Sequence, residues 1–139
     1  MNNLEKAKLN LKDENTLVLV KGEIIYVSQG HGVRPMLDFI NNKIDLTGFS
    51  VADKVVGKGA AMLFIYAKIS EVYARLISKP ALAVLNEHKV KVTYDKLVNN
   101  IINKRGDDLC PMEKATLNID DILEAYKVLC EKNNVRPLN

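Results

Sequence analysis

Three side chains of this sequence have the chemistry to act on a substrate: the thiol of Cys110 and the carboxyl groups of Asp53 and Glu113. Cys110 stands directly before Pro111, a residue that favours the first turn of a helix, and the dipole at a helix N-terminus stabilises a thiolate. Cys110 could therefore act as a nucleophile or a redox thiol, with Asp53 or Glu113 moving a proton. The alternative is that Cys110 is a small buried side chain beside a loop, and Glu113 an acid of the first helical turn.

A second group of side chains has the charge and the hydrogen-bonding capacity to hold an anion. Its members are two serines expected to cap helices and four basic residues: Ser50, Ser78, Arg34, Lys54, Lys58 and Lys79. The first N–H groups of a helix, together with nearby lysines, suit a phosphate or a carboxylate group. For Lys54 and Lys58, which are four residues apart, the ordinary alternative is a solvated helix face.

A loop with two glycines precedes a predicted helix that runs from Pro35 to about Asn41. Segment 28–35 reads Ser-Gln-Gly-His-Gly-Val-Arg-Pro. Its glycines permit backbone conformations closed to other residues, so its N–H groups and Arg34 could hold an anion. We favour the simpler interpretation of a strand-to-helix connection, in which His31, with no second histidine nearby, is a solvated loop residue rather than a ligand.

Composition limits the classes of protein to which the chain can belong. Its 139 residues are 47% hydrophobic and 27% charged, which indicates one globular domain spanning 1–139. The net charge of +3 suits an anionic metabolite, whereas so weak a charge and an aromatic fraction of 6% disfavour nucleic-acid binding. The two cysteines form no CxxC motif, and the sequence carries neither an apolar leader nor an apolar run of membrane-spanning length. We therefore expect a cytoplasmic protein.

The stretch 50–64 is expected to form the central helix of the fold. Ser50 and Asp53 have the Ser-x-x-Asp spacing of a capping box, so Asp53 could simply satisfy backbone donors. The later residues are small or apolar, as in a helix buried against a sheet. Gly57 and Gly59 each cost about 1 kcal/mol relative to alanine inside a helix, which predicts that another backbone or a ligand approaches closely there. The start of this helix is the best candidate for a binding site.

The remaining segments predict an α/β fold. An amphipathic helix near the N-terminus precedes two β-branched runs, at 16–20 and 23–27, that predict an antiparallel hairpin. Later segments predict a strand at 71–77, a helix at 80–86, a strand at 89–94, a short helix at 94–102, a helix starting at Pro111 and a helix at 122–132. Strands that alternate with helices imply parallel crossovers. We expect a three-layer α/β/α sandwich whose mixed sheet starts with the antiparallel hairpin.

Four segments carry a family resemblance: LVLVKGEIIY at 17–26, SVADKVVGK at 50–58, VYA at 72–74 and LCPME at 109–113. Together they resemble an uncharacterised prokaryotic family, known as a domain of unknown function, whose fold is classed as cytidine-deaminase-like. The resemblance covers roughly the whole chain. It implies a cytidine-deaminase-like fold and brings no established activity.

The resemblance also implies a comparison with zinc-dependent deaminases. In those enzymes the start of the central helix supplies His or Cys and a proton-shuttling Glu, and a later Pro-Cys-x-x-Cys turn supplies two more ligands. Here the first place reads Val-Ala-Asp-Lys at 51–54, and the turn at 78–84 keeps Pro80 but has Ala81 and Val84 in place of the cysteines. Apolar side chains do not coordinate zinc, so we expect no zinc site, no zinc-dependent deamination and no cofactor.

The leading functional hypothesis is a small-molecule binding protein, with a nucleotide or a related phosphorylated metabolite as its ligand. A metal-free enzyme that uses Cys110 with Asp53 or Glu113 is the first alternative. A non-catalytic interaction module, for example a homo-oligomer, is the second.

Overall fold

A computed structural model describes residues 1–138 and contains one five-stranded sheet with the strand order β2-β1-β3-β4-β5. Strands β1 (Leu17–Lys21) and β2 (Ile24–Ser28) form the expected antiparallel hairpin. Gly22 has a φ of +62° in the connecting turn, a conformation that glycine adopts without strain. The first four residues of β1 are buried, which places this strand inside the sheet as expected.

The second half of the sheet is parallel and contains two strand–helix–strand crossovers. Strand β3 (Ser50–Val56) leads into helix α3 (Lys58–Tyr66), and strand β4 (Glu71–Ser78) leads into helix α4 (Lys79–Glu87) and strand β5 (Lys91–Val98). Strand β3 pairs antiparallel with β1 and parallel with β4, and β4 pairs parallel with β5. The carboxyl ends of β3 and β4 and the starts of α3 and α4 therefore lie at one edge of the sheet.

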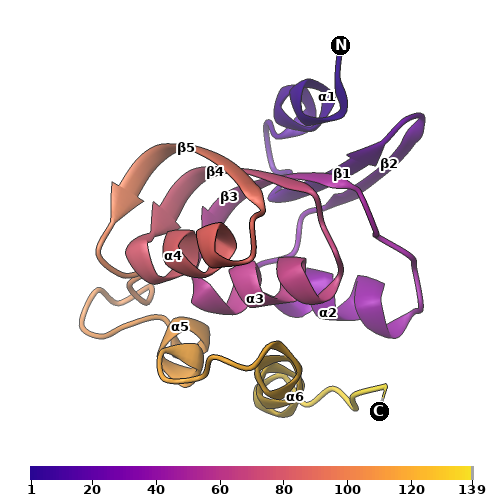
Figure 1. Ribbon diagram of the computed structural model, residues 1–139. Coiled ribbons are helices and arrows are strands. Elements are labelled where there is room, and N and C mark those ends of the chain that lie inside the picture. The colour runs from indigo at the N-terminus through magenta and orange to yellow at the C-terminus, as the bar shows by residue number, and fades with distance from the viewer. Residues whose placement is uncertain (139) are drawn as a thin grey trace.

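The helices are arranged in layers on the two faces of the sheet (Figure 1). Helix α1 (Asn3–Asn10) packs on one face, while α2 (Arg34–Asn41), α3 and α4 lie on the other. Helices α5 (Pro111–Thr116) and α6 (Ile122–Lys132) pack against α3 on the side away from the sheet. This is the expected α/β/α sandwich with a mixed sheet, to which α5 and α6 add a further layer. No helix within residues 1–138 combines the length and the apolar character of a membrane span.

The expected central helix at 50–64 is wrong in its first half. Residues 50–56 form β3, and α3 begins only at Lys58 with Gly57 as its N-cap. Ser50 caps no helix, Asp53 belongs to no capping box, and Lys54 and Lys58 share no helix face. The physical reason is that β-branched Val51, Val55 and Val56 favour a strand, and β1 and β4 supply backbone partners on both sides of it.

The expected short helix at 94–102 is also wrong. Strand β5 continues through Val98, paired with β4 along its whole length. Polar residues in its second half resemble the start of a helix in sequence, but β5 is an edge strand whose outer side faces solvent. By contrast, three predicted helix starts are confirmed: Pro35 lies in the first turn of α2, Pro111 opens α5, and Ser78 caps α4 by accepting the N–H of Ala81.

Gly57 and Gly59 predicted that another backbone or a ligand approaches the chain closely there, and the surroundings of Gly59 test this prediction. A Cβ atom built on Gly59 would lie 3.2 Å from a methyl carbon of Leu129 and 3.3 Å from the carbonyl oxygen of Met112, so α5 and α6 approach the start of α3 closely. We expect Gly59→Ala to lower the free energy of unfolding by about 1–2 kcal/mol through overpacking. Urea denaturation would measure this, with exposed Lys79→Ala as a control. At an unstrained site, replacing glycine by alanine stabilises a protein by about 0.4–1 kcal/mol. A Gly59→Ala protein more stable than the wild type would therefore contradict the close packing of Gly59 against α5 and α6.

Candidate functional site

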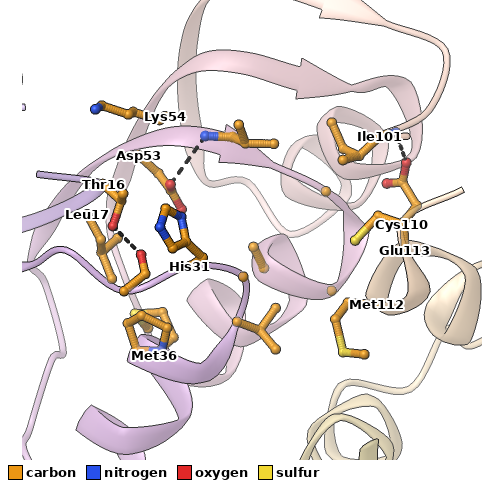
Figure 2. Close-up of a pocket in the computed structure, with 18 of the residues that line it drawn as sticks. Thr16, Leu17, His31, Met36, Asp53, Lys54, Ile101, Cys110, Met112 and Glu113 are labelled. Carbon is orange, nitrogen blue, oxygen red and sulfur yellow. Dashed lines mark hydrogen bonds between the residues drawn. The ribbon is translucent and has the colours of Figure 1, made fainter. Parts of the chain in front are cut away.

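A cavity of about 920 Å³ opens where the end of β3 meets the start of α3. Five parts of the chain enclose it: the start of β1 with residues before it, the loop 29–32 with the start of α2, the end of β3 with the start of α3, segment 101–104, and the start of α5. Figure 2 shows side chains from these segments pointing into one space. The walls are mainly apolar, with Leu17, Val33, Met36, Ile101 and Met112 among them.

Asp53 brings a carboxyl group to this cavity. In β3 it pairs with Leu17 of β1, and strand alternation puts it on the same face as buried Val51, toward α2 and α3. One carboxylate oxygen accepts the N–H of Val55 at 3.3 Å. Burial raises the pKa of Asp53 to about 7, opposed by hydrogen bonds from the backbone of Val55 and Lys54. Asp53 can therefore exchange a proton near neutral pH, which is the property of a general acid or base.

Glu113 has a different position, because its carboxylate is already fully engaged. It is only 1% exposed, and one oxygen accepts the N–H of Lys58 at 2.8 Å and the hydroxyl of Ser78 at 2.6 Å. The other oxygen accepts the N–H of Ile101. Glu113 thus ties the first residue of α3, the N-cap of α4 and segment 101–104 to α5, and its lone pairs are committed to the fold.

Cys110 lies in the cavity wall as the half-buried N-cap of α5, and Figure 2 shows its sulfur beside the start of this helix. Its backbone N–H donates to the carbonyl of Ile101 at 2.8 Å, which fixes segment 101–104 against α5. Cys110 and Asp53 therefore face the same cavity from opposite walls.

The start of α3 forms one wall of the cavity. Gly57, Gly59 and Ala60 line it, and the side chains here are too small to cover the backbone. The first N–H groups of a helix have no partner within the helix. Glu113 accepts the N–H of Lys58, so the N–H groups of Gly59 and Ala60 are the donors that this wall can offer to a ligand.

Of the six residues predicted to hold an anion, Lys54 alone lines the cavity, and its Nζ donates to the carbonyl of Asp13 at 2.8 Å. The buried Lys58 ammonium donates to the carbonyl of Leu117 at 2.9 Å. Ser50 lies at the opposite end of β3, and Ser78 is occupied by Glu113.

The two other basic residues predicted to hold an anion also lie outside the cavity lining. Lys79 is exposed at the start of α4, and Arg34 is paired with Asp38 at 2.9 Å. Of the nine predicted site residues, the structure therefore gathers four around the cavity: Asp53, Lys54, Cys110 and Glu113.

Several cavity residues carry no chemical signal in the sequence. Thr16 donates its hydroxyl to the carbonyl of Gly30 and so anchors the loop at the cavity mouth, where His31 also lines the wall. Ile101, Ile102 and Met112 are apolar residues with no distinguishing feature in the sequence, and the fold places them together in the cavity wall. The two glycines of the loop, Gly30 and Gly32, were a signal in the sequence, and both line the cavity.

The comparison with zinc-dependent deaminases needs one correction. Residues 51–54, which were expected to begin the central helix, belong to strand β3. The helix begins at Lys58 with Gly57 as its N-cap, and this start also contains neither His nor Cys. Within residues 1–138, no three His, Cys, Asp or Glu side chains gather into a group that could hold a metal ion.

The fold and the cavity define a small α/β protein with a site of small-molecule size at the carboxyl edge of its parallel strands. Residues 6–133 match the family model described as TM1506: Domain of unknown function (DUF1893), and the chain belongs to this family. A solved DUF1893 family protein (TM1506) from Thermotoga maritima is similar at 31% identity with a TM-score of 0.84, over 95% of this chain and 91% of that one.

Two weaker likenesses concern solved deaminases. The dCMP deaminase from the cyanophage S-TIM5, in apo form, matches at 14% identity and a TM-score of 0.45, over 69% of this chain and 94% of that one. A diaminohydroxyphosphoribosylaminopyrimidine deaminase/5-amino-6-(5-phosphoribosylamino)uracil reductase from Thermotoga maritima matches at 16% identity with a TM-score of 0.44. The match covers 82% of this chain and 38% of that one. No curated protein matches the chain. The mixed five-stranded sheet between helical layers confirms the α/β/α sandwich expected from the sequence.

Proposed function

We propose that the cavity binds a small organic molecule, and that a nucleotide or a related phosphorylated metabolite is its ligand class. The observation that carries this proposal is a carboxyl group, Asp53, in the wall of a largely apolar cavity of about 920 Å³ at the carboxyl edge of the parallel strands. Ligand sites of α/β proteins gather at this edge, and cavities of about 300–1,000 Å³ suit metabolite-sized ligands.

The apolar walls suit the flat ring of such a ligand. Leu17, Val33 and Met36 approach from β1 and α2, and Ile101 and Met112 from the other side. A heterocycle between them would bury its faces, while its polar edge could reach Asp53. An aliphatic ligand would leave this carboxyl group without a partner.

The wall formed by α3 and the lysines at the cavity edge suit the charged end of the ligand. The N–H groups of Gly59 and Ala60 point out of the start of a nine-residue helix, where a phosphate is favoured. Lys54 and Lys104 line the same cavity and add positive charge. Lys58, Lys79 and Arg34 take no part in this proposal, because none of them lines the cavity.

A thermal-shift screen with nucleosides, nucleotides and sugar phosphates tests the proposal. A compound at about 100 times its dissociation constant should stabilise the protein by about 2.7 kcal/mol, a rise of several degrees in melting temperature. We expect Lys54→Ala to weaken the shift given by phosphorylated compounds, and Lys79→Ala, on an exposed lysine outside the cavity, to leave it unchanged. Equal shifts in both variants would place the phosphate elsewhere. If no compound binds, the interaction module becomes the better hypothesis.

A metal-free enzyme is the second candidate, because Cys110 and Asp53 line the same cavity. Glu113 is excluded from a direct role, since three donors already occupy its oxygens. Compounds that bind in the screen can be incubated with the wild type and with Cys110→Ala. Conversion by the wild type alone supports the enzyme, and binding without conversion supports a sensor or carrier.

A further inference from the structure

We propose that Asp53 determines which ligand the cavity accepts, by pairing with a heterocycle that presents a ring N–H beside an exocyclic amino group. This inference rests on the proposed small-molecule function of the cavity and names the chemical class of its ligand. The two N–H donors of such an edge match the two oxygens of one carboxylate, as they do in bidentate pairs of arginine with carboxylates.

The first argument is that the Asp53 carboxylate has unused acceptor capacity. A carboxylate offers about four acceptor positions on its two oxygens. Within residues 1–138, the Asp53 carboxyl accepts the N–H of Val55 at a long 3.3 Å. The N–H of Lys54, which also lowers the Asp53 pKa, donates to the carbonyl of Thr16 at 3.1 Å.

Glu113, in the same cavity, accepts three shorter bonds, so most of its acceptor positions are taken. The other two carboxyl groups of the lining, Asp13 and Glu14, are exposed to solvent. Asp53 is therefore the partly buried carboxylate of the lining that has most acceptor capacity left for a ligand.

The second argument is that the surrounding side chains do not supply the missing donors. Leu17, Val33 and Met36 are apolar, and the ammonium group of Lys54 is held at the carbonyl of Asp13 at 2.8 Å. The other titratable groups along the wall are Asp13, Glu14, His31, Lys104, Cys110 and Glu113. Burial makes ionisation of Asp53 unfavourable and outweighs the hydrogen bonds from the backbone of Val55 and Lys54, which is why its pKa is raised to about 7.

The third argument concerns the kind of ligand that relieves this state. A donor pair from the ligand would stabilise the ionised carboxylate. Two carbonyl oxygens would meet at most one donor, the O–H of the protonated carboxyl, and would leave the second carbonyl without a partner. A site with an unpaired polar group discriminates strongly against an analogue that fails to pair with it. The rest of the heterocycle would lie against the apolar walls, as in the proposed function.

Isothermal titration calorimetry with matched compounds tests the inference. Guanosine monophosphate carries both N–H donors, and inosine monophosphate lacks the amino group; aminobenzimidazole and benzimidazole form the same comparison without sugar or phosphate. We expect the compound with the amino group to bind about tenfold to a hundredfold more tightly to the wild type. Asp53→Asn should abolish the preference, and Asp120→Asn, which changes an exposed carboxyl outside the cavity lining, should keep it.

A second readout separates a pairing role from a merely structural one. Binding of the donor pair near pH 7 should release protons from Asp53, so the apparent binding enthalpy should vary with the ionisation enthalpy of the buffer, in the wild type and not in Asp53→Asn. If both members of each pair bind the wild type equally, the inference is wrong while the proposed function stands. If neither pair binds, the inference is wrong; if nucleotides and sugar phosphates also fail in the thermal-shift screen, the proposed function fails with it.

Discussion

Replacing Glu113 by alanine is expected to lower the free energy of unfolding by about 3–5 kcal/mol, because each buried donor left without a partner costs about 1–3 kcal/mol. The change removes the acceptor of three donors at once: the N–H groups of Lys58 and Ile101 and the hydroxyl of Ser78. It also leaves a void at a side chain that is 1% exposed. Urea denaturation followed by circular dichroism would measure the loss.

Glutamine at the same position separates the hydrogen bonds from the packing. Glu113→Gln keeps the volume and one acceptor oxygen, but it turns an NH₂ group toward an N–H donor. We expect an intermediate loss of about 1–3 kcal/mol. Glu131→Ala, on an exposed acid of α6, should stay within about 0.5 kcal/mol of the wild type. A Glu113→Ala protein as stable as this control would show that the carboxylate does not hold the two helix starts together.

Glu113 also holds two helix starts together at the carboxyl ends of the parallel strands. The N–H of Lys58, at the start of α3, and the hydroxyl of Ser78, the N-cap of α4, both donate to this carboxylate from α5. A side chain from a later segment thus serves as the common acceptor of the two helix starts.

Local sequence signals predicted those elements whose structure is decided locally. The hairpin with Gly22 in its turn, the cap at Ser78 and the prolines that open α2 and α5 were all expected and are confirmed. Segment 50–56 was misread because the spacing of Ser50 and Asp53 imitates a capping box. What makes it a strand is pairing with β1 and β4, and neither partner is visible in the segment itself.

The candidate site was predictable only in part, for a related reason. Asp53 and Cys110 attract attention by their chemistry alone, and both do line the cavity. Their partners in the wall, such as Leu17 and Ile101, come from segments far apart in the chain and have no distinguishing chemistry. Ser50 and Lys79, two residues predicted to hold an anion, lie outside the cavity lining. Ser50 belongs to a strand rather than to a helix cap, and an exposed lysine at a helix start need not face the cavity.

Asp53→Asn is expected to stabilise the protein at pH 8 and to leave its stability unchanged at pH 4. The pKa of Asp53 is raised by burial from 3.8 to about 7, so between these values the folded state binds a proton that the unfolded state lacks. Stability then falls with rising pH across this window, and the loss is complete above the folded-state pKa. Asparagine, which does not ionise, escapes this loss.

The expected size of the effect follows from the shift. One pKa unit corresponds to about 1.4 kcal/mol, which sets an upper limit of about 4 kcal/mol for a shift of this size. Asp53 is only partly buried, and a carboxylate that retains some hydration loses less, so we expect a gain of about 2 kcal/mol at pH 8. Urea denaturation of the wild type and the variant at several pH values between 4 and 8 measures it, and other titrating groups cancel in the difference.

The control is Asp120→Asn, which makes the same change at an exposed carboxyl group outside the cavity lining. If the stability difference between Asp53→Asn and the wild type varies with pH no more than the difference for this control, the predicted effect of burial on Asp53 is wrong. A difference that grows as the pH rises from 4 to 7 means that the fold keeps an ionisable group in an environment that destabilises its charge. This destabilisation is not explained by a structural role: within residues 1–138, Asp53 bonds to the backbone of its own strand, whereas Glu113 links several segments. A ligand with hydrogen-bond donors would stabilise the ionised Asp53 carboxylate and so offset the loss of folding free energy.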